Sequence, residues 1–434
     1  MCCNDNTPSF ITSNNNGLMK IRNNDDAWQN GMAKTITFIV TKDCQLACKY
    51  CYLVGKNKNE RMSWETARTF VDYVLEHEND PIFAYRSVIW DFIGGEPFLE
   101  IELIDKICDY IKLRMFELNH HWFNSYRFSF TTNGINYHTP DVQNYIQKNR
   151  HHLSIGVTID GTEKKHDLNR IWKQPSADAN GIAISSERGS YKDVVKNIPL
   201  WLSQFPNAGT KVTISSADIP YITESVLHLY GLGIHDVHIN VVFEDVWQEG
   251  DDSRFEEQLI SLADAIIDGG YYQDYVCSFF SENIGKPLNP ERDNKNWCGA
   301  GKMLSVDAAG NLYPCTRFAQ YSLRDKKALI IGNIHDGINQ NLLRPFLTLD
   351  RVTQSPQKCL DCEVASGCAW CQGENYDAAQ TNTIYERSTA ICLMHKARVR
   401  ANNYYWNKLY RKLELEGRRE EFEANKRDVK PEIC

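Results

Sequence analysis

The sequence predicts an α/β protein in which six strand-then-helix units precede a smaller, cysteine-rich domain. From Thr35 to about Gly270, short β-branched and aromatic runs alternate with amphipathic stretches, the pattern of parallel strands joined by right-handed crossovers. After about Asn283 the sequence changes to turns, short segments and closely spaced cysteines. The repeat is compatible with an open doubly wound sheet or with a barrel of fewer than eight units, and either one places chemistry at the carboxyl ends of its strands.

Each expected strand is followed by a helical stretch. The expected strands are Ile36–Val40, Val88–Ile93, Arg127–Thr131, Leu153–Ile159, Lys211–Ser215 and Val237–Phe243. The expected helices cover residues 63–78, 101–117, 140–149, 191–204, 220–230 and 253–268. Ser63 is expected to cap the first helix. In the second helix, the spacing of one buried face is shown by Ile101, Ile104, Cys108, Ile111 and Met115.

Four segments divide the chain: a polar arm (1–33), the strand–helix region (34–282), the cysteine-rich region (283–392) and a C-terminal helix (393–434). The C-terminal helix carries an apolar stripe that we expect to pack against the body, made of Tyr404, Tyr405, Trp406 and Leu409. Ile171–Ser190 is a polar insertion, expected to be a lid or loop. His120 and His121 are expected at a solvated helix end.

Composition excludes several classes of protein. The 48 lysines and arginines against 56 aspartates and glutamates give a net charge of −8, so a uniform basic field for nucleic acid is absent. No apolar run approaches the roughly 18 residues of a membrane helix, and the first residues do not resemble a signal peptide. A cytoplasmic location is therefore expected. In that reducing compartment, the clustered members of the 15 cysteines indicate metal ligands rather than disulfides.

Cys44, Cys48 and Cys51 form the first cysteine group, directly after the first expected strand. Three thiolates can hold three corners of a [4Fe–4S] cluster and leave the fourth iron open to a small molecule. A structural zinc site is the alternative, but it needs a fourth ligand and none is obvious nearby. Cysteines packed as small apolar side chains are the remaining interpretation.

The cysteine group resembles the signature of the radical S-adenosylmethionine (SAM) enzymes, in which the open iron chelates SAM. Gly94-Gly95-Glu96-Pro97 and Thr131-Thr132-Asn133-Gly134 follow the next two strands and resemble that family's second motif and its ribose-contacting strand end. The segment Ser154–Asp160 resembles a further SAM contact. The resemblance implies a partial (β/α)6 barrel. It also implies that SAM is contacted by Gly94, Gly95, Glu96, Pro97, Thr131, Asn133 and Thr158.

The C-terminal cysteines resemble a SPASM domain, which carries two auxiliary [4Fe–4S] clusters and would bring the total to three. By that resemblance one cluster is held by Cys359, Cys362, Cys368 and Cys392, and the other by Cys298, Cys315 and Cys371. A zinc ribbon is the alternative, but its cysteine pairs are usually about 15–20 residues apart. The second cluster lacks a fourth cysteine, so its iron is open or recruits a distant ligand, with Cys277 and Cys434 as candidates.

The resemblance implies an enzyme that forms a radical from SAM, removes hydrogen from a ribosomally made peptide and installs a thioether or carbon–carbon cross-link. It implies an electron donor such as flavodoxin or ferredoxin, and no nucleic-acid or membrane partner. A sulfatase maturase that forms formylglycine is one alternative, although Thr316 stands where that group has an Asp. An iron–sulfur electron carrier is another. No catalytic residue is assigned; His166 is a possible base, but a structural role is favoured.

Overall fold

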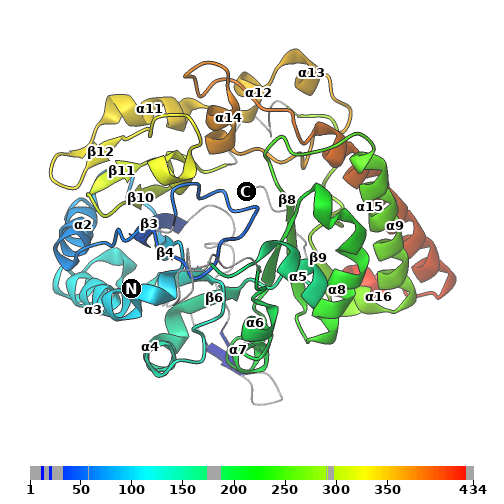
Figure 1. The fold of residues 1–434 in the computed structure, drawn as a ribbon, viewed down its shortest axis with the longest axis horizontal. Helices are drawn as coiled ribbons and strands as arrows, with labels where there is room; N and C mark the ends of the chain where they lie inside the picture. Colours follow the sequence, from blue (N-terminus) through cyan, green and yellow to red (C-terminus); the bar gives the residue numbers. More distant parts are fainter. Residues whose placement is uncertain are drawn as a thin grey trace, which may run out of the picture.

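The computed structural model describes residues 11–13, 19–21, 33–56, 58–173, 187–289, 291 and 298–426 (Figure 1). Most of the predicted N-terminal arm and residues 174–186 of the predicted lid lie outside the described residues. Within the arm, β1 (Ile11–Ser13) and β2 (Met19–Ile21) pair antiparallel.

All six predicted strands are present and parallel to their neighbours. The first four are β3 (Ala33–Thr41), β4 (Ser87–Gly94), β5 (Tyr126–Thr132) and β6 (Leu153–Val157), paired in that order. A second sheet contains β7 (Thr210–Ile214), β8 (Asp236–Val241) and a short unpredicted β9 (Val276–Cys277). Their helices lie on the outer side (Figure 1), so the strands form a barrel rather than a doubly wound sheet.

The barrel wall is incomplete between β6 and β7, which belong to different sheets. A side chain connects them instead of a backbone ladder. Thr210 Oγ1 donates to the carbonyl of Val157 at 2.8 Å and accepts from the N–H of Ile159 at 3.1 Å. The predicted partial barrel is therefore confirmed, with a threonine hydroxyl joining its two halves.

Each predicted helical stretch of the barrel is also present. The helices are α2 (Trp64–Glu76), α3 (Ile101–Glu117), α4 (Pro140–Asn149), α5 (Glu163–Asn169), α6 (Tyr191–Val195), α7 (Ile198–Gln204), α8 (Ile222–Gly231) and α9 (Asp251–Asp268). Ser63 caps α2 by accepting from the N–H of Thr66, and the predicted face of α3 is buried. The stretch 191–204 is divided into α6 and α7, with Pro199 in the first turn of α7. α5 was not predicted.

The cysteine-rich region continues the barrel sheet. Its strands are β10 (Leu304–Val306), β11 (Asn311–Tyr313), β12 (Gly332–Asn333) and β13 (Gly337–Ile338). Because β10 pairs parallel with β3, one eight-stranded sheet runs from β13 to β6. Its helices are α11 (Gln340–Thr348), α12 (Arg351–Gln354), α13 (Gln357–Leu360) and α14 (Gln372–Ala378). Short 3₁₀ helices are η1 (Pro97–Glu100), η2 (His121–Asn124), η3 (Arg150–His152), η4 (Ser216–Tyr221), η5 (Tyr271–Gln273), η6 (Thr316–Phe318) and η7 (Gln320–Ser322).

The C-terminal helix is α15 (Cys392–Leu415), followed after Gly417 by α16 (Arg419–Asn425). Gly417 has a φ of +66°, a left-handed conformation that ends a helix most easily at glycine. Of the predicted stripe, Tyr405 and Leu409 are buried, whereas Tyr404 is 37% exposed and donates to Asp264 of α9. None of the described helices is both long enough and apolar enough to cross a bilayer.

Candidate functional site

The loops after β3 and β4 pack directly on each other. The N–H of Gly95 donates to the carbonyl of Thr41 at 3.0 Å, and the N–H of Glu96 donates to that of Asp43 at 2.9 Å. A Cβ on Gly95 would lie 2.1 Å from the Asp43 carbonyl oxygen and 2.9 Å from Cys44 Cβ. The glycine is therefore required by the approach of the cysteine loop, a contact that the sequence does not reveal.

Glu96 joins the ends of β4 and β5. Its carboxylate accepts from the N–H of Phe98 at 3.1 Å, the hydroxyl of Thr132 at 2.6 Å and the N–H of Asn133 at 2.7 Å. The residue is 2% exposed, and this burial raises the pKa of its carboxyl group against the opposing effect of the three hydrogen bonds. Pro97 begins η1 in the first turn, so the carboxylate also caps that helix.

The loop after β5 turns towards the cysteines. The Asn133 side chain donates to Gln45 Oε1 at 3.0 Å, and its Nδ2 lies 4.0 Å from Cys44 Sγ. Thr158 lies alongside, with its N–H donating to the carbonyl of Thr132 at 3.0 Å. The predicted Thr131 is exposed, whereas its neighbour Thr132 is buried and its hydroxyl donates to Glu96; the sequence did not single out Thr132 for this role.

A buried ionic network lies behind the cysteine loop. The hydroxyl of Tyr50 donates to Asp160, and Arg170 Nη1 donates to the Tyr50 oxygen at 3.1 Å. Lys165 Nζ lies 3.4 Å from Asp160 and 3.7 Å from Asp218. Although burial alone would raise it, Lys165 and Arg170 hold the pKa of Asp160 below its ordinary value. Arg170 Nε is buried with no hydrogen-bond partner among the described residues, which leaves one donor for a ligand.

His166 is held by its surroundings as a neutral ring. Its Nδ1 accepts from the N–H of Asp160 at 3.2 Å, so the proton lies on Nε2, which is 2.9 Å from the hydroxyl of Ser190. That hydroxyl in turn donates to the carbonyl of Arg170 at 2.8 Å. Burial, followed by the charge of Arg170, lowers the pKa of His166 to about 3. These contacts favour the structural role over the role of base.

A cavity of about 590 Å³ opens beside the cysteine loop. It lies between that loop, the carboxyl ends of β7 and β8, and the cysteine-rich region. Its charged and aromatic lining residues are Lys49, Tyr50, Tyr52, Glu244, Arg254, Arg324 and Asp377, and Cys51 also lines it. The first cysteine group therefore borders a space large enough for a small molecule and part of a substrate.

Arg317 connects this cavity to the auxiliary cysteines. Its Nη2 lies 3.3 Å from Glu244 and 2.6 Å from Glu374, and its guanidinium lies 4.6 Å from the centre of the Tyr52 ring. Burial, and secondly Glu244, raise the pKa of Glu374 to about 7, even though Arg317 and Arg324 oppose the shift. The backbone N–H of Arg317 also donates to Cys315 Sγ at 3.4 Å.

The C-terminal cysteines fall into two places. Cys359, Cys362, Cys368 and Cys392 together line a cavity of about 610 Å³. Elsewhere, Cys298 Sγ accepts from the N–H of Gln372 at 3.5 Å, next to Cys371. Burial, and secondly Cys371, raise the pKa of Cys315 to about 12. The structure therefore places Cys359, Cys362, Cys368 and Cys392 around one cavity, and Cys298 and Cys315 near Cys371; their roles as cluster ligands stay a prediction.

Cys277 lies apart from both groups. It is buried in β9 and lines a different cavity with Tyr230 and Tyr405. The contacts therefore favour a buried apolar role for this thiol. The other candidate fourth ligand, Cys434, lies outside the described residues.

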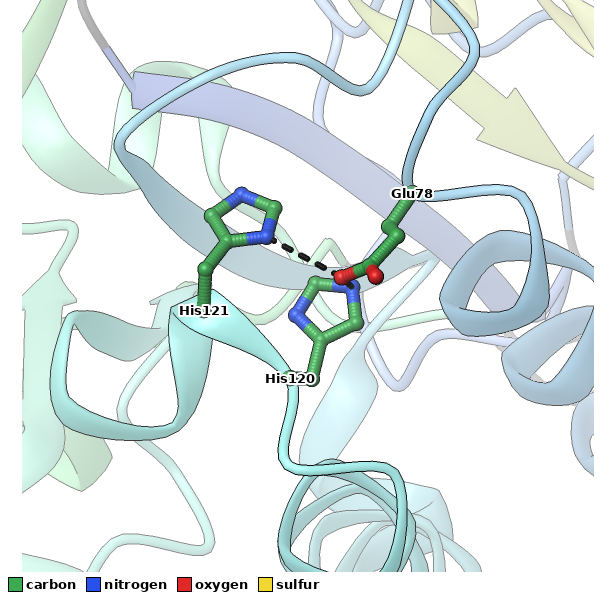
Figure 2. Close-up of side chains that lie close together, drawn as sticks. All are labelled: Glu78, His120 and His121. Atoms are coloured by element: carbon green, nitrogen blue, oxygen red, sulfur yellow. Dashed lines mark hydrogen bonds and ion pairs between the residues drawn. The ribbon is translucent and has the colours of Figure 1, made fainter.

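One group in the described part of the chain, Glu78 with His120 and His121, places three possible ligand atoms within 4.8 Å of one another (Figure 2). No set of three described thiols is gathered so closely.

The prediction of a solvated helix end is wrong for His120. Its side chain is fully buried beside η2, because Trp122 and His121 pack against it, whereas His121 is 42% exposed. The N–H of Trp122 donates to His120 Nδ1 at 3.1 Å, so the neutral ring carries its proton on Nε2. Burial lowers the pKa of His120 to about 4. With Nε2 protonated and aimed at Glu78 (Figure 2), His120 is not available as a metal ligand.

Residues 30–178 match the family described as 4Fe-4S single cluster domain. The chain is 24% identical over 307 residues to uncharacterized protein MJ0907 of Methanocaldococcus jannaschii, covering 70% of this chain and 89% of that protein. It is 18% identical over 358 residues to the radical SAM cyclopropyl synthase TigE of Paramaledivibacter caminithermalis, covering 77% of this chain and 67% of that protein.

Two of the similar solved structures contain a bound peptide. Native anSMEcpe with bound AdoMet and Cp18Cys peptide aligns with a TM-score of 0.57 at 17% identity, covering 86% of this chain and 99% of that chain. Streptococcus suis SuiB bound to precursor peptide SuiA aligns with a TM-score of 0.51 at 14% identity, covering 87% and 83%. The likeness shows that this chain shares the fold of these two proteins.

Proposed function

We propose that this protein is a radical SAM enzyme that modifies a ribosomally made peptide. One observation carries the proposal: three motif-bearing loops meet beside the cavity, at the carboxyl ends of β3, β4 and β5. They are the cysteine loop, the Gly-Gly-Glu-Pro loop and the Thr-Thr-Asn-Gly loop. The hydrogen bonds that Glu96 accepts from Thr132 and Asn133 hold the second and third loops in place. A peptide substrate is supported by the similar structures, since anSMEcpe was solved with a peptide and SuiB with its precursor peptide.

In this proposal Cys44, Cys48 and Cys51 hold the first cluster, and the fourth iron is left for SAM. SAM is contacted by Gly94, Gly95, Glu96, Pro97, Thr131, Asn133 and Thr158. When bound, the cluster and SAM supply a 5′-deoxyadenosyl radical that removes hydrogen from an unactivated carbon. Glu96 already accepts three hydrogen bonds from the protein, so its main task is to hold the loops in register. The buried Nε of Arg170 offers a donor on the same side.

The cysteine-rich region (283–392) holds two auxiliary clusters in this proposal, which makes three clusters with the one in the barrel region (34–282). Cys359, Cys362, Cys368 and Cys392 supply a full set of four thiolates. Cys298, Cys315 and Cys371 supply three, and Cys277 is placed elsewhere. An iron without a protein thiolate suits thioether formation, because a substrate thiolate could be held there beside the carbon radical.

The proposed product is a thioether or a carbon–carbon cross-link. The formylglycine alternative lacks its carboxylate directly after Cys315, where Thr316 and Arg317 stand. Glu244 is a carboxylate in the cavity wall, but its Oε1 pairs with Arg317. We also propose a cytoplasmic location and an electron donor of the flavodoxin or ferredoxin type.

The experiment is co-expression with the peptide encoded beside the gene, followed by mass spectrometry. A cross-link removes two hydrogen atoms from the peptide and survives alkylation of free thiols. Formylglycine from cysteine would change the mass by exchanging sulfur for oxygen as well. An unmodified peptide in cells that contain the loaded protein would count against the proposal. A triple variant of Cys44, Cys48 and Cys51 to Ala is the matched control.

A further inference from the structure

The inner face of the barrel sheet is accessible to solvent. Along β4, β5, β6 and β7, buried residues alternate with half-buried or exposed ones. The buried set faces the surrounding helices (Figure 1): Phe130 of β5, for example, packs against Tyr145 of α4. The accessible set therefore faces the lumen. Most α/β barrels fill this space with branched apolar side chains, so an accessible inner face leaves room for a ligand.

One level of the inner face is polar on every strand of the larger sheet that reaches it. The register of β10, β3, β4, β5 and β6 places five polar residues side by side: Ser305, Thr37, Asp91, Ser129 and Ser154. Residues in register share a face of the sheet, so these side chains form one row, which we call the polar row. A carboxylate thus stands in the middle of the row with hydroxyl groups on both sides.

Asp91 has only neutral partners in the polar row. Thr37 Oγ1 donates to its Oδ2 at 3.4 Å, and the Ser129 hydroxyl also donates to it. No cation among the described residues forms an ion pair with Asp91. Burial raises the pKa of its carboxyl group to about 6, against the effect of the two hydroxyls, so the group is still ionised at neutral pH. A sheltered, unpaired charge is costly, and such charges gather at functional sites.

The other charged residues of the inner face do not compensate Asp91. Arg127 of β5 is held by the carbonyl of Leu153 at 2.7 Å and by Ser154 Oγ at 3.0 Å. Asp236 of β8, the other inner-face acid of these strands, lies 3.3 Å from His238. Neither Arg127 nor Lys211 of β7 lowers the pKa of Asp91. Asp91 is therefore the inner-face carboxylate that is left for a partner from outside the described chain.

We propose that Asp91 binds a positively charged side chain of the substrate peptide, a lysine or an arginine, inside the barrel. The proposal rests on the proposed function, because it places the peptide in the lumen below the cysteine loop. Ammonium and guanidinium groups carry only hydrogen-bond donors, and the carboxylate with its flanking hydroxyls supplies acceptors. A bond between two charged groups is shorter and stronger than a neutral one, so a single carboxylate can select a basic residue.

The depth of Asp91 limits where the charge stands in the substrate. Asp91 precedes Gly94 by three residues, and the loop that Gly94 begins contacts the cysteine loop. Three residues of a strand span about 10 Å, and an extended peptide covers the same distance in about three residues. The basic residue of the substrate should therefore stand within about three positions of the residue that is modified.

The test measures binding of the fluorescently labelled peptide encoded beside the gene to the iron-loaded protein, by fluorescence anisotropy. Asp91→Asn should weaken binding about tenfold, because the charged partner is lost. Replacing the basic residue of the peptide with glutamine should weaken binding to the native protein as much, and this arm leaves the protein unchanged. The two changes together should cost no more than either one alone, as expected for groups that contact each other. Asp91→Glu keeps the charge and should recover part of the affinity.

Asp105→Asn is the matched control. It removes the same charge from α3, outside the barrel, where Asp105 pairs with Lys148, and it should change affinity less than twofold. Iron content, with SAM cleavage driven by dithionite, shows that Asp91→Asn is folded and loaded. Equal affinities of the native protein and Asp91→Asn, additive losses in the combination, or a modified peptide with no basic residue in range would each overturn the proposal. If the peptide binds through Asp91 and is never modified, the proposed function fails and the binding site stands.

Discussion

The carboxylate of Glu96, at the end of β4, accepts a hydrogen bond from the backbone N–H of Asn133, at the end of β5, over 2.7 Å. With the bond from the Thr132 hydroxyl, it fixes two strand ends beside the cysteine loop. The three loops that carry the motifs therefore behave as one unit. A change in any of these loops is therefore expected to displace the cysteine side chains.

Glu96→Gln should disrupt this unit. Glutamine keeps one acceptor oxygen but presents an amide N–H₂ to a group of donors, so a buried donor loses its partner. The expected cost is about 1–3 kcal/mol in the free energy of unfolding, together with loss of SAM cleavage. Denaturant unfolding measures the first effect. Glu100→Gln is the control, since Glu100 pairs with exposed Arg61; equal losses in both variants would contradict the role given to Glu96.

Gly95→Ala should displace the cysteine loop. The added Cβ would lie 2.1 Å from the carbonyl oxygen of Asp43, and backbone must move to relieve that contact. We expect a loss of about 1–3 kcal/mol in stability and less iron per chain, measured after anaerobic reconstitution. Gly156→Ala is the control, because its nearest neighbours are 3.8 Å away. Normal iron content in Gly95→Ala would show that the loop tolerates the shift.

Much of the fold could be predicted because it is local. The apolar period marks the six strands and their helices, and Ser63 caps α2 as expected. The pairing of β10 with β3 could not be predicted, because β10 has only three residues and its partner lies about 270 positions earlier. His120 was misplaced for a similar reason: the aromatic packing that buries it is tertiary.

In the candidate site, too, some features follow from the sequence and others depend on tertiary contacts. The order of the motifs at successive strand ends predicts that the cysteine loop, the glycine loop and Asn133 lie close together, and the structure places them in contact. The contacts of Arg317 with Glu244 and Glu374 join three distant segments, and no spacing in the sequence signals them. The requirement for glycine at position 95 could not be predicted either, because it comes from the close approach of the Asp43 carbonyl in the folded structure.

Stability should fall as the solution becomes acidic, partly because of His166. Its folded pKa is about 3, against an ordinary value of about 6.5, so between these values the unfolded chain binds a proton that the folded chain does not. The free energy of unfolding therefore falls as pH falls through this window, by about 2 kcal/mol from pH 6.5 to 5 for this residue. Denaturant unfolding at pH 8, 6.5 and 5 measures the slope. His166→Gln should have a shallower slope; an unchanged slope would contradict the assignment.

Arg317→Lys should weaken the connection between the cavity and the auxiliary cysteines. A single lysine ammonium group cannot pair with both Glu244 and Glu374 while also covering the Tyr52 ring. Because Glu374 is only 2% exposed, water does not replace the lost partner. We expect a loss of about 1–3 kcal/mol in the free energy of unfolding. Arg188→Lys is the control: Arg188 likewise pairs with a carboxylate, that of Asp193, and covers the Trp172 ring, but its side chain is 63% exposed. Equal effects would mean that burial of Glu374 is unimportant.

The most direct test of the account is reductive cleavage of SAM. The iron-loaded protein is incubated with dithionite and SAM without oxygen, and 5′-deoxyadenosine is measured by mass spectrometry. The account predicts 5′-deoxyadenosine from the native chain and none from the variant with Cys44, Cys48 and Cys51 changed to Ala, whose iron content should fall by about a third because the auxiliary thiolates remain. Cleavage that persists in this variant, or no cleavage by the native chain with all its clusters, would contradict the assignment of these three cysteines.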